Sequence, residues 1–142
     1  MTVAAAQTNA PRSRLVALAA MAVAMALGLA SRRWPDLLPP TLGKYPGDAL
    51  WALMVFFGWR ALRPGARTRD VAVCAMATST VVEFAKLWHA PWLVAFRHTS
   101  VGHLLLGHVF SWQNLVAYGV GVMAGVALDR LASRLLLHTA TA

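Results

Sequence analysis

The chain is a succession of long apolar runs separated by short polar or proline-rich segments. Runs over residues 15–30, 48–62, 71–88 and 111–130 come close to the length that spans a bilayer and predict four transmembrane helices. Residues 31–47 contain four prolines and two glycines and cannot form a regular helix. Residues 89–110 predict two or three short amphipathic turns. We therefore expect an all-α fold, a four-helix transmembrane bundle with short interfacial helices in the outer loops.

The two ends of the chain differ in composition from this membrane domain. Residues 1–14 predict a disordered N-terminal tail, residues 15–134 a single integral membrane domain, and residues 135–142 a C-terminal tail. The first apolar run is also compatible with a cleaved signal peptide, because Arg12 and Arg14 precede it and residues 28–30 resemble a cleavage site. Its near-spanning length and the Arg-Arg-Trp that follows favour a retained helix. Both interpretations stay open.

Composition supports a membrane protein. Of the 142 residues, 58% are hydrophobic and 13% charged, against roughly 25% charged in soluble domains. The net charge of +8 comes mainly from arginines that flank apolar runs. At such positions arginines set the topology of a membrane protein and contact anionic lipids. No basic run is interleaved with aromatic residues, so nucleic-acid binding is not expected. The single Cys74 excludes an intrachain disulfide.

The distribution of Lys and Arg predicts the orientation. With both termini in the cytoplasm, eight basic residues lie inside and five outside, which follows the positive-inside rule. The turn over residues 63–69, with three arginines, is then cytoplasmic. Arg60, near the end of the second helix, is expected to reach the interface with its long side chain. We predict a multi-pass protein of the bacterial inner membrane, with membrane lipids as its first partners and a membrane-protein partner or a second copy as further ones.

Strongly polar side chains converge in the outer half of this predicted bundle. Glu83 would lie about 18 Å above the start of the third helix, near the depth of the polar start of the fourth. A charge inside a spanning helix costs on the order of 3 kcal/mol and normally faces the bundle or a wet cavity. The predicted binding residues at this level are Lys44, Asp48, Glu83, Lys86, Arg97, Asn114 and Tyr118.

Two interpretations of this outer cluster are open. In the first, Glu83 is a clamp that is neutralised by Lys86, Arg97 or Lys44, or held by the Asn114 amide, and it only ties helices together. In the second, the cluster is a pocket whose cations bind an anionic headgroup while Glu83 orients them or carries a proton. The catalytic residues, if there are any, stay unknown.

The fourth helix carries a packing face. Asn114, Tyr118, Gly121, Gly125 and Asp129 recur at three- and four-residue steps, which places them on one side of a helix. The Gly121-x-x-x-Gly125 spacing lets another backbone approach closely. The histidines at 98, 103 and 108 are five apart and do not share a face, so we predict no metal site. No nucleotide or other cofactor motif occurs, and none is expected.

The segments "RRWPDLLPPTLGKYPGDALWALMVFF", "APWLVAFRHTSVGHLLLG" and "FSWQNLVAYGVGVMAG", together with Glu83, resemble the bacterial domain-of-unknown-function family 2809, small VanZ-like inner-membrane proteins. The resemblance covers about residues 32–130. Its markers are Gly43, Lys44, Gly47, Asp48, Trp51, Glu83, Arg97, Gly107, Tyr118 and Gly121. In the broader VanZ-like pattern, Glu83, Arg97 and Asn114 fill expected places, whereas Lys86 stands where a glutamine is expected and an expected aspartate is replaced. The resemblance implies fold and location, and it implies little about activity.

Three functions follow as hypotheses. The preferred one is a non-enzymatic cell-envelope factor that binds an anionic lipid or glycolipid headgroup at the outer cluster. The second is a membrane enzyme that acts on a lipid-linked phosphate with Glu83 as acid or base. The third is a small transporter or an accessory subunit of a larger complex.

Overall fold

The protein is described by a computed structural model, which covers the backbone of residues 3–34, 36, 38–107 and 109–140 and the side chains of residues 14–34, 36, 38–107 and 109–135. This described part is all-helical, with six α-helices, one short 3-10 helix and no strand, as the sequence predicts. In chain order the elements are α1 (Val3–Arg33), η2 (Pro40–Leu42), α2 (Tyr45–Leu62), α3 (Thr68–Ala85), α4 (Pro91–Arg97), α5 (Ser100–Leu106) and α6 (Trp112–Ala140).

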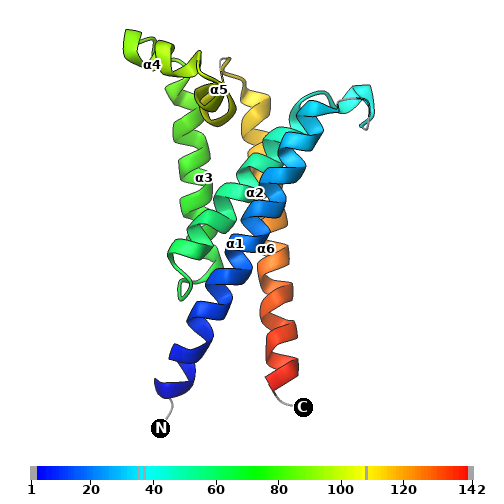
Figure 1. Ribbon diagram of the computed structural model, residues 1–142, viewed down its shortest axis with the longest axis vertical. Coiled ribbons are helices and arrows are strands. Elements are labelled where there is room, and N and C mark those ends of the chain that lie inside the picture. The colour runs from blue at the N-terminus through cyan, green and yellow to red at the C-terminus, as the bar shows by residue number, and fades with distance from the viewer. Residues whose placement is uncertain (1–2, 35, 37, 108, 141–142) are drawn as a thin grey trace.

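The four long helices run alongside one another, with α2 between the other three (Figure 1). The short helices α4 and α5 lie at one end of this bundle, together with the connection from α1 to α2. We call this the α4/α5 end. The turn between α2 and α3 lies toward the opposite end, where both chain termini are found, and we call this the α2–α3 end.

The observed helix bounds differ from the predicted ones mainly at the chain ends. The backbone of α1 begins at Val3 and so includes most of the predicted N-terminal tail, and α6 continues to Ala140 instead of ending at Arg130. The side chains of residues 1–13 and 136–142 lie outside the described part. Alanine and arginine, which occur in both stretches, and leucine, which is frequent in the second, are strong helix formers.

Two helices, not four, are long and apolar enough to cross a membrane by length and composition. These are Arg14–Arg33 within α1 and Trp112–Leu135 within α6. The prediction of four spanning helices is corrected to this extent. The other two long helices have 18 residues each and include charged side chains, Asp48 and Arg60 in α2 and Asp70 and Glu83 in α3, which lower their mean hydropathy.

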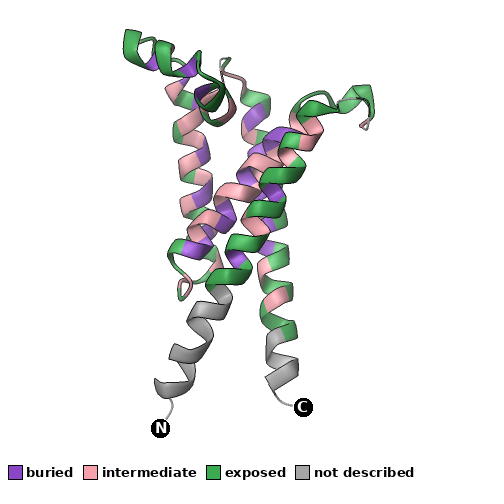
Figure 2. Ribbon diagram, viewed as in Figure 1, coloured by how far each residue is buried: buried purple, intermediate pink, exposed green. Residues whose placement is uncertain are grey.

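The core lies where α2 meets α3 and α6, and Figure 2 shows the buried residues on the facing sides of these helices. Phe56 at its centre is fully buried. Small residues on α6 bring it close to α2: a Cβ on Gly121 would lie 2.0 Å from the Ala49 carbonyl oxygen, and a Cβ on Gly125 would lie 2.6 Å from the Phe56 ring. A Cβ on Gly119 would meet nothing within 4 Å. Gly121 and Gly125 therefore set the distance between these two helices.

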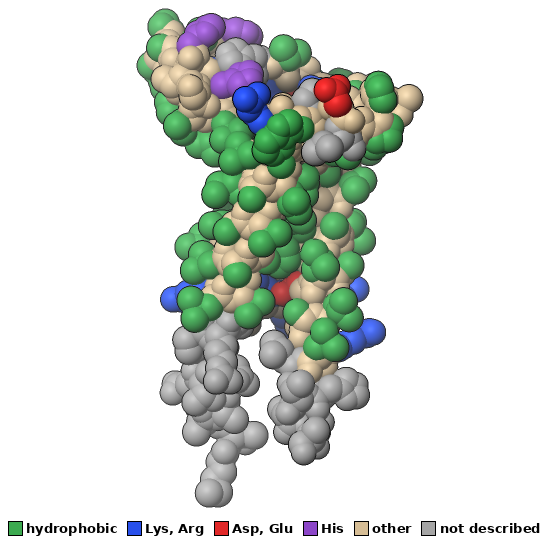
Figure 3. All heavy atoms as spheres, turned by 45° about the vertical axis from the view of Figure 1, so that its right-hand side comes forward, with side chains coloured by type: hydrophobic (Ala, Val, Ile, Leu, Met, Phe, Trp, Pro, Cys, Tyr) green, Lys and Arg blue, Asp and Glu red, His purple; other side chains and the backbone are tan. Residues whose placement is uncertain are grey.

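The outside of the bundle is apolar. Figure 3 shows hydrophobic side chains over the middle of the visible face and basic side chains toward its two ends. Large exposed hydrophobic residues occur on all four long helices, among them Val23 on α1, Leu62 at the end of α2, Val81 on α3 and Val120 on α6. Continuous apolar surface of this kind marks contact with lipid or with another protein.

Candidate functional site

Glu83, in the last turn of α3, is the centre of a buried polar cluster at the α4/α5 end. Its side chain is fully buried (0% exposed) and both carboxylate oxygens accept hydrogen bonds. Oε2 accepts from the Lys86 ammonium at 2.5 Å and from the Tyr118 hydroxyl at 2.7 Å. Oε1 accepts from the Ser111 backbone N–H at 2.8 Å and from the Asn114 side-chain amide at 3.1 Å. Four donors occupy about the full accepting capacity of a carboxylate.

This arrangement ties α3 to the start of α6. Lys86 supplies the neutralising charge from the turn that follows α3, and its own side chain is almost fully buried. The other three donors come from residues at the start of α6 or just before it. A buried carboxylate is stable only when it is paired and hydrogen-bonded, and Glu83 is both. The carboxylate therefore has the geometry expected of a clamp.

Arg97 does not join this cluster as an ion-pair partner. It ends α4, is 3% exposed, and its guanidinium donates to the backbone carbonyls of Ala85 and Lys86. Those carbonyls lie at the C-terminus of α3, where acceptors have no partner inside the helix and a positive charge is favoured. Arg97 thus fastens α4 across the end of α3, and its guanidinium makes no salt bridge within the described residues.

Asp48, in the first turn of α2, forms a second ion pair near the first. One carboxylate oxygen accepts from the Arg32 guanidinium of α1 at 3.3 Å, and the other, also buried, has no hydrogen-bond partner within the described part. Lys44, just before α2, is exposed and forms no ion pair with any residue that the structure describes. Of the predicted binding residues, Lys44 is therefore the cation most available to a ligand.

These groups meet in an open pocket of about 410 Å³, which we call the cationic pocket. It is lined by Arg32, Lys44, Asp48, Lys86, His103, Gly107, Val109 and Asn114. Gly107 follows the last residue of α5 and has a φ of +64°, which glycine adopts without strain. A Cβ at this position would lie 3.3 Å from the Lys86 side chain, so a glycine also leaves room for the lysine. The buried Asn114 side-chain oxygen also has no partner within the described residues.

Sequence reasoning missed Arg32 and Ser111 as members of this region. Arg32 was interpreted as a topology signal after the first apolar run, although it pairs with Asp48 and lines the cationic pocket. Ser111 acts through its backbone N–H, which carries no side-chain signal. The one available hint was position, since Ser111 directly precedes the polar start of α6.

A third ion pair, between Arg60 and Asp129, is buried at the α2–α3 end. Arg60 is 8% exposed and donates to Asp129 of α6, to the Thr68 hydroxyl at 3.2 Å and to the Ala66 carbonyl at 2.7 Å. The Thr68 hydroxyl in turn donates to Asp129 at 2.6 Å. Arg60 does not extend freely from the bundle, because the Asp129 carboxylate on the packing face of α6 and the carbonyls of the α2–α3 turn hold its guanidinium.

The histidines that the structure describes do not form a metal site. His103 lines the cationic pocket, His98 lies at the end of α4, and His108 is outside the described residues. No group of three His, Cys, Asp or Glu side chains that could hold a metal ion occurs in the described part of the chain.

The fold and this site define an all-α protein with an apolar outer surface and a buried ionic cluster beneath one end of its bundle. Residues 37–122, more than half of the chain, match the family described as "Protein of unknown function (DUF2809)", and the chain belongs to that family. The match includes all seven predicted binding residues and Gly121, whereas Arg32, Gly125 and Asp129 lie outside it. No solved structure matches the chain.

Proposed function

We propose that the protein is a multi-pass protein of the bacterial inner membrane that binds an anionic lipid or glycolipid headgroup in the cationic pocket, without catalysing a reaction on it. The observation that carries the proposal is the charge balance of the pocket region. Three cations, Arg32, Lys44 and Lys86, line the pocket. They stand against Asp48, which also lines it, and Glu83, which pairs with Lys86 behind it, so one positive charge is in excess. An anion in the pocket offsets this surplus at a site that is only partly screened by water.

The residues divide into those that hold the pocket and those that contact the ligand. Glu83 and Arg97 are engaged by the protein itself and fix α3, α4 and α6 around the site. The exposed Lys44 and the half-exposed Arg32 face the open side, where a phosphate accepts hydrogen bonds from them. The unpartnered oxygens of Asp48 and Asn114 accept from hydroxyl groups. This combination suits a headgroup that carries both a phosphate and hydroxyls, as phosphatidylglycerol and glycolipid phosphates do.

Binding is favoured over catalysis and transport by two features. A general acid or base needs to exchange its proton with the substrate, and the Glu83 carboxylate is already occupied by four donors. A transport path would have to join the two polar clusters. The space between them is filled by core residues such as Phe56 and Val122.

The membrane placement is part of the proposal. Helices α1 and α6 cross the bilayer, α2 packs against both of them, and α3 packs against α6. The arginine-rich turn over residues 63–69 faces the cytoplasm and the α4/α5 end faces outward. The packing of α1 along α2 supports a retained first helix rather than a cleaved signal peptide. The VanZ-like resemblance agrees with this placement.

The orientation is tested by labelling single cysteines on intact cells in a Cys74→Ala background. Gly65→Cys lies in the exposed turn between α2 and α3, where a Cβ meets nothing within 4 Å, and Thr41→Cys lies in the exposed connection before α2. An impermeant thiol reagent should label position 41 and spare position 65 until the cells are opened. Labelling of position 65 but not of position 41 on intact cells would show that the true orientation is the reverse of the proposed one.

Headgroup binding is tested by ligand-induced stabilisation of the purified protein in detergent. A ligand that binds only the folded state raises the temperature of thermal aggregation. Dioleoyl-phosphatidylglycerol should raise it more than dioleoyl-phosphatidylcholine does, and Lys44→Gln and Arg32→Gln should each reduce that difference. Arg69→Gln, the same charge change on an exposed arginine at the other end, is the matched control and should keep it. Equal stabilisation by the two lipids in the unmodified protein would refute the proposal.

A further inference from the structure

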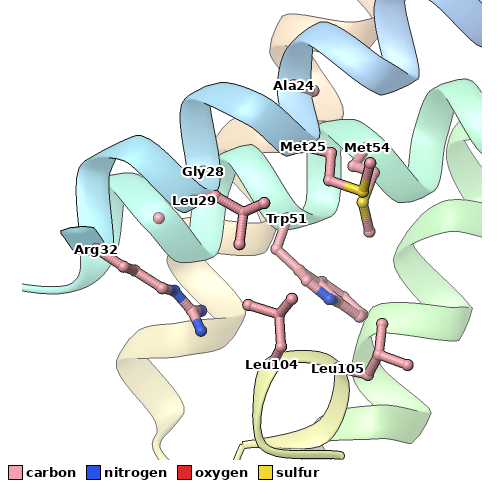
Figure 4. Close-up of a pocket in the computed structure, with 10 residues that line it drawn as sticks. Ala24, Met25, Gly28, Leu29, Arg32, Trp51, Met54, Leu104 and Leu105 are labelled. Carbon is pink, nitrogen blue, oxygen red and sulfur yellow. The ribbon is translucent and has the colours of Figure 1, made fainter. Parts of the chain in front are cut away.

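A narrow apolar slot adjoins the cationic pocket. It has a volume of about 50 Å³ and lies between α1, α2 and α5. Figure 4 shows its wall, with Met25 and Leu29 from α1, Trp51 and Met54 from α2, and Leu104 and Leu105 from α5. Apart from Arg32 at one end, the side chains that line it are hydrophobic or absent, as in glycine.

The slot and the cationic pocket are neighbours that share a lining residue. Arg32 lines both of them. A smaller cavity of about 30 Å³, lined by Asp48, Lys86 and Tyr118 among others, also shares Arg32 with both and shares Trp51 with the slot. A molecule with an anionic end and an apolar end can therefore place its charge beside Arg32 and Lys44 while its apolar part enters the slot.

Trp51 carries a polar group in this apolar surrounding. Its indole N–H is buried and has no hydrogen-bond partner among the described residues. In Figure 4 the ring lies between Met54 and the two leucines of α5, and on the inner side it packs against Tyr118 at 5.5 Å between ring centroids. A buried indole N–H normally finds an acceptor, so its isolation indicates the place of an acceptor that belongs to a ligand.

We propose that the ligand of the cationic pocket is a glycerophospholipid whose ester carbonyl accepts a hydrogen bond from Trp51 and whose acyl chain starts in the slot. The inference rests on the headgroup binding proposed above and adds the class of ligand and its way of entry. In a phospholipid the ester carbonyls follow the phosphate by a few bonds, which matches a cationic pocket lined by Arg32 next to two cavities lined by Trp51. The exposed side chains of Met25, Leu29 and Leu105 place the slot's mouth on the apolar outer surface, so the lipid enters sideways from the bilayer.

The hydrogen bond is tested by comparing ester-linked with ether-linked phosphatidylglycerol, which lacks the carbonyls. The apparent affinity of each lipid is measured by native mass spectrometry of the detergent-solubilised protein. The unmodified protein should bind the ester lipid about 2- to 10-fold more tightly, the range expected for one hydrogen bond. Trp51→Phe keeps an aromatic ring against Tyr118 but removes the donor, and it should bind both lipids equally. The same ester preference in Trp51→Phe would overturn the role of the indole.

The slot is tested with phosphatidylglycerol that carries a photoreactive diazirine near the start of one acyl chain. Irradiation followed by peptide mapping should place adducts on the α1, α2 and α5 residues that line the slot. Leu105→Trp, which fills the mouth, should reduce these adducts at least fivefold. Val101→Trp is the control, because Val101 is exposed on the same helix but does not line the slot. It should leave the adducts unchanged.

The outcomes separate this inference from the proposed function. If phosphatidylglycerol still binds in preference to phosphatidylcholine but the adducts are spread over Val73, Val120 and other exposed positions, the headgroup site stands and the slot is refuted. If the preference for phosphatidylglycerol is itself absent, the proposed function fails and this inference fails with it.

Discussion

Replacement of Glu83 by glutamine isolates the charge of the clamp from its shape. Glutamine retains one carbonyl oxygen, which can still accept from the Ser111 N–H and the Asn114 amide. It presents an NH₂ group to the Lys86 ammonium in place of Oε2, so the buried lysine loses its counter-charge. Leaving one member of a buried ion pair unpaired costs about 3–5 kcal/mol. We expect the lower part of that range, about 3 kcal/mol, because Lys86 also lines the open cationic pocket.

The assay is equilibrium unfolding in mixed micelles of dodecyl maltoside and SDS, monitored by circular dichroism. Asp70→Asn is the matched control, an amide replacement of an exposed carboxylate in the first turn of the same helix, and it should change the free energy of unfolding by less than about 0.5 kcal/mol. The double variant Glu83→Gln/Lys86→Met removes the stranded charge and should recover at least half of the loss. A loss below about 1 kcal/mol in Glu83→Gln, or a double variant no more stable than the single one, would refute the clamp.

Two further predictions concern the packing of α6 and the Arg60–Asp129 ion pair. Gly121→Ala should destabilise the protein by about 1–3 kcal/mol, because the new methyl group meets the α2 backbone. Gly119→Ala should be neutral or stabilising, because its methyl group meets nothing. Equal effects of the two substitutions in thermal aggregation assays would contradict a single packed face on α6. Asp129→Asn leaves the buried Arg60 without a counter-charge and should lower the free energy of unfolding by about 3 kcal/mol in the same micellar assay. Arg130→Gln, at an exposed position, should change it by less than about 0.5 kcal/mol. Similar losses in the two variants would contradict a specific ion pair.

The sequence was most informative where geometry follows from helix rise alone. Glu83, Asn114 and Tyr118 were placed at one depth from the 1.5 Å rise per residue, and in the structure they meet in one cluster. Lys86 was a natural partner for Glu83 because residues three apart share a helix face. The spacing of Gly121 and Gly125 identified the side of α6 that approaches α2 closely. Each of these inferences needs only one helix, or two helices at known depth.

Contacts that depend on how separate elements are rotated could not be predicted. Arg60 and Asp129 are 69 positions apart, and their pairing requires that α2 and α6 turn these two faces toward each other. Arg97 is one of the three cations that the sequence offers as a counter-charge for Glu83, but the path of α4 places its guanidinium on the carbonyls at the end of α3. Helical periodicity gives the faces of a helix but does not say which neighbour covers each face.

The most direct test of the account is the identity of the lipid that stays with the protein. Native mass spectrometry of protein extracted from bacterial membranes, with Lys44→Gln and Arg69→Gln prepared in parallel, measures the mass and amount of each bound lipid. The account predicts one anionic phospholipid on the unmodified protein and on Arg69→Gln, and a several-fold smaller bound fraction on Lys44→Gln. Retention of phosphatidylethanolamine in proportion to its abundance in the membrane, with the same fraction on all three proteins, would contradict it.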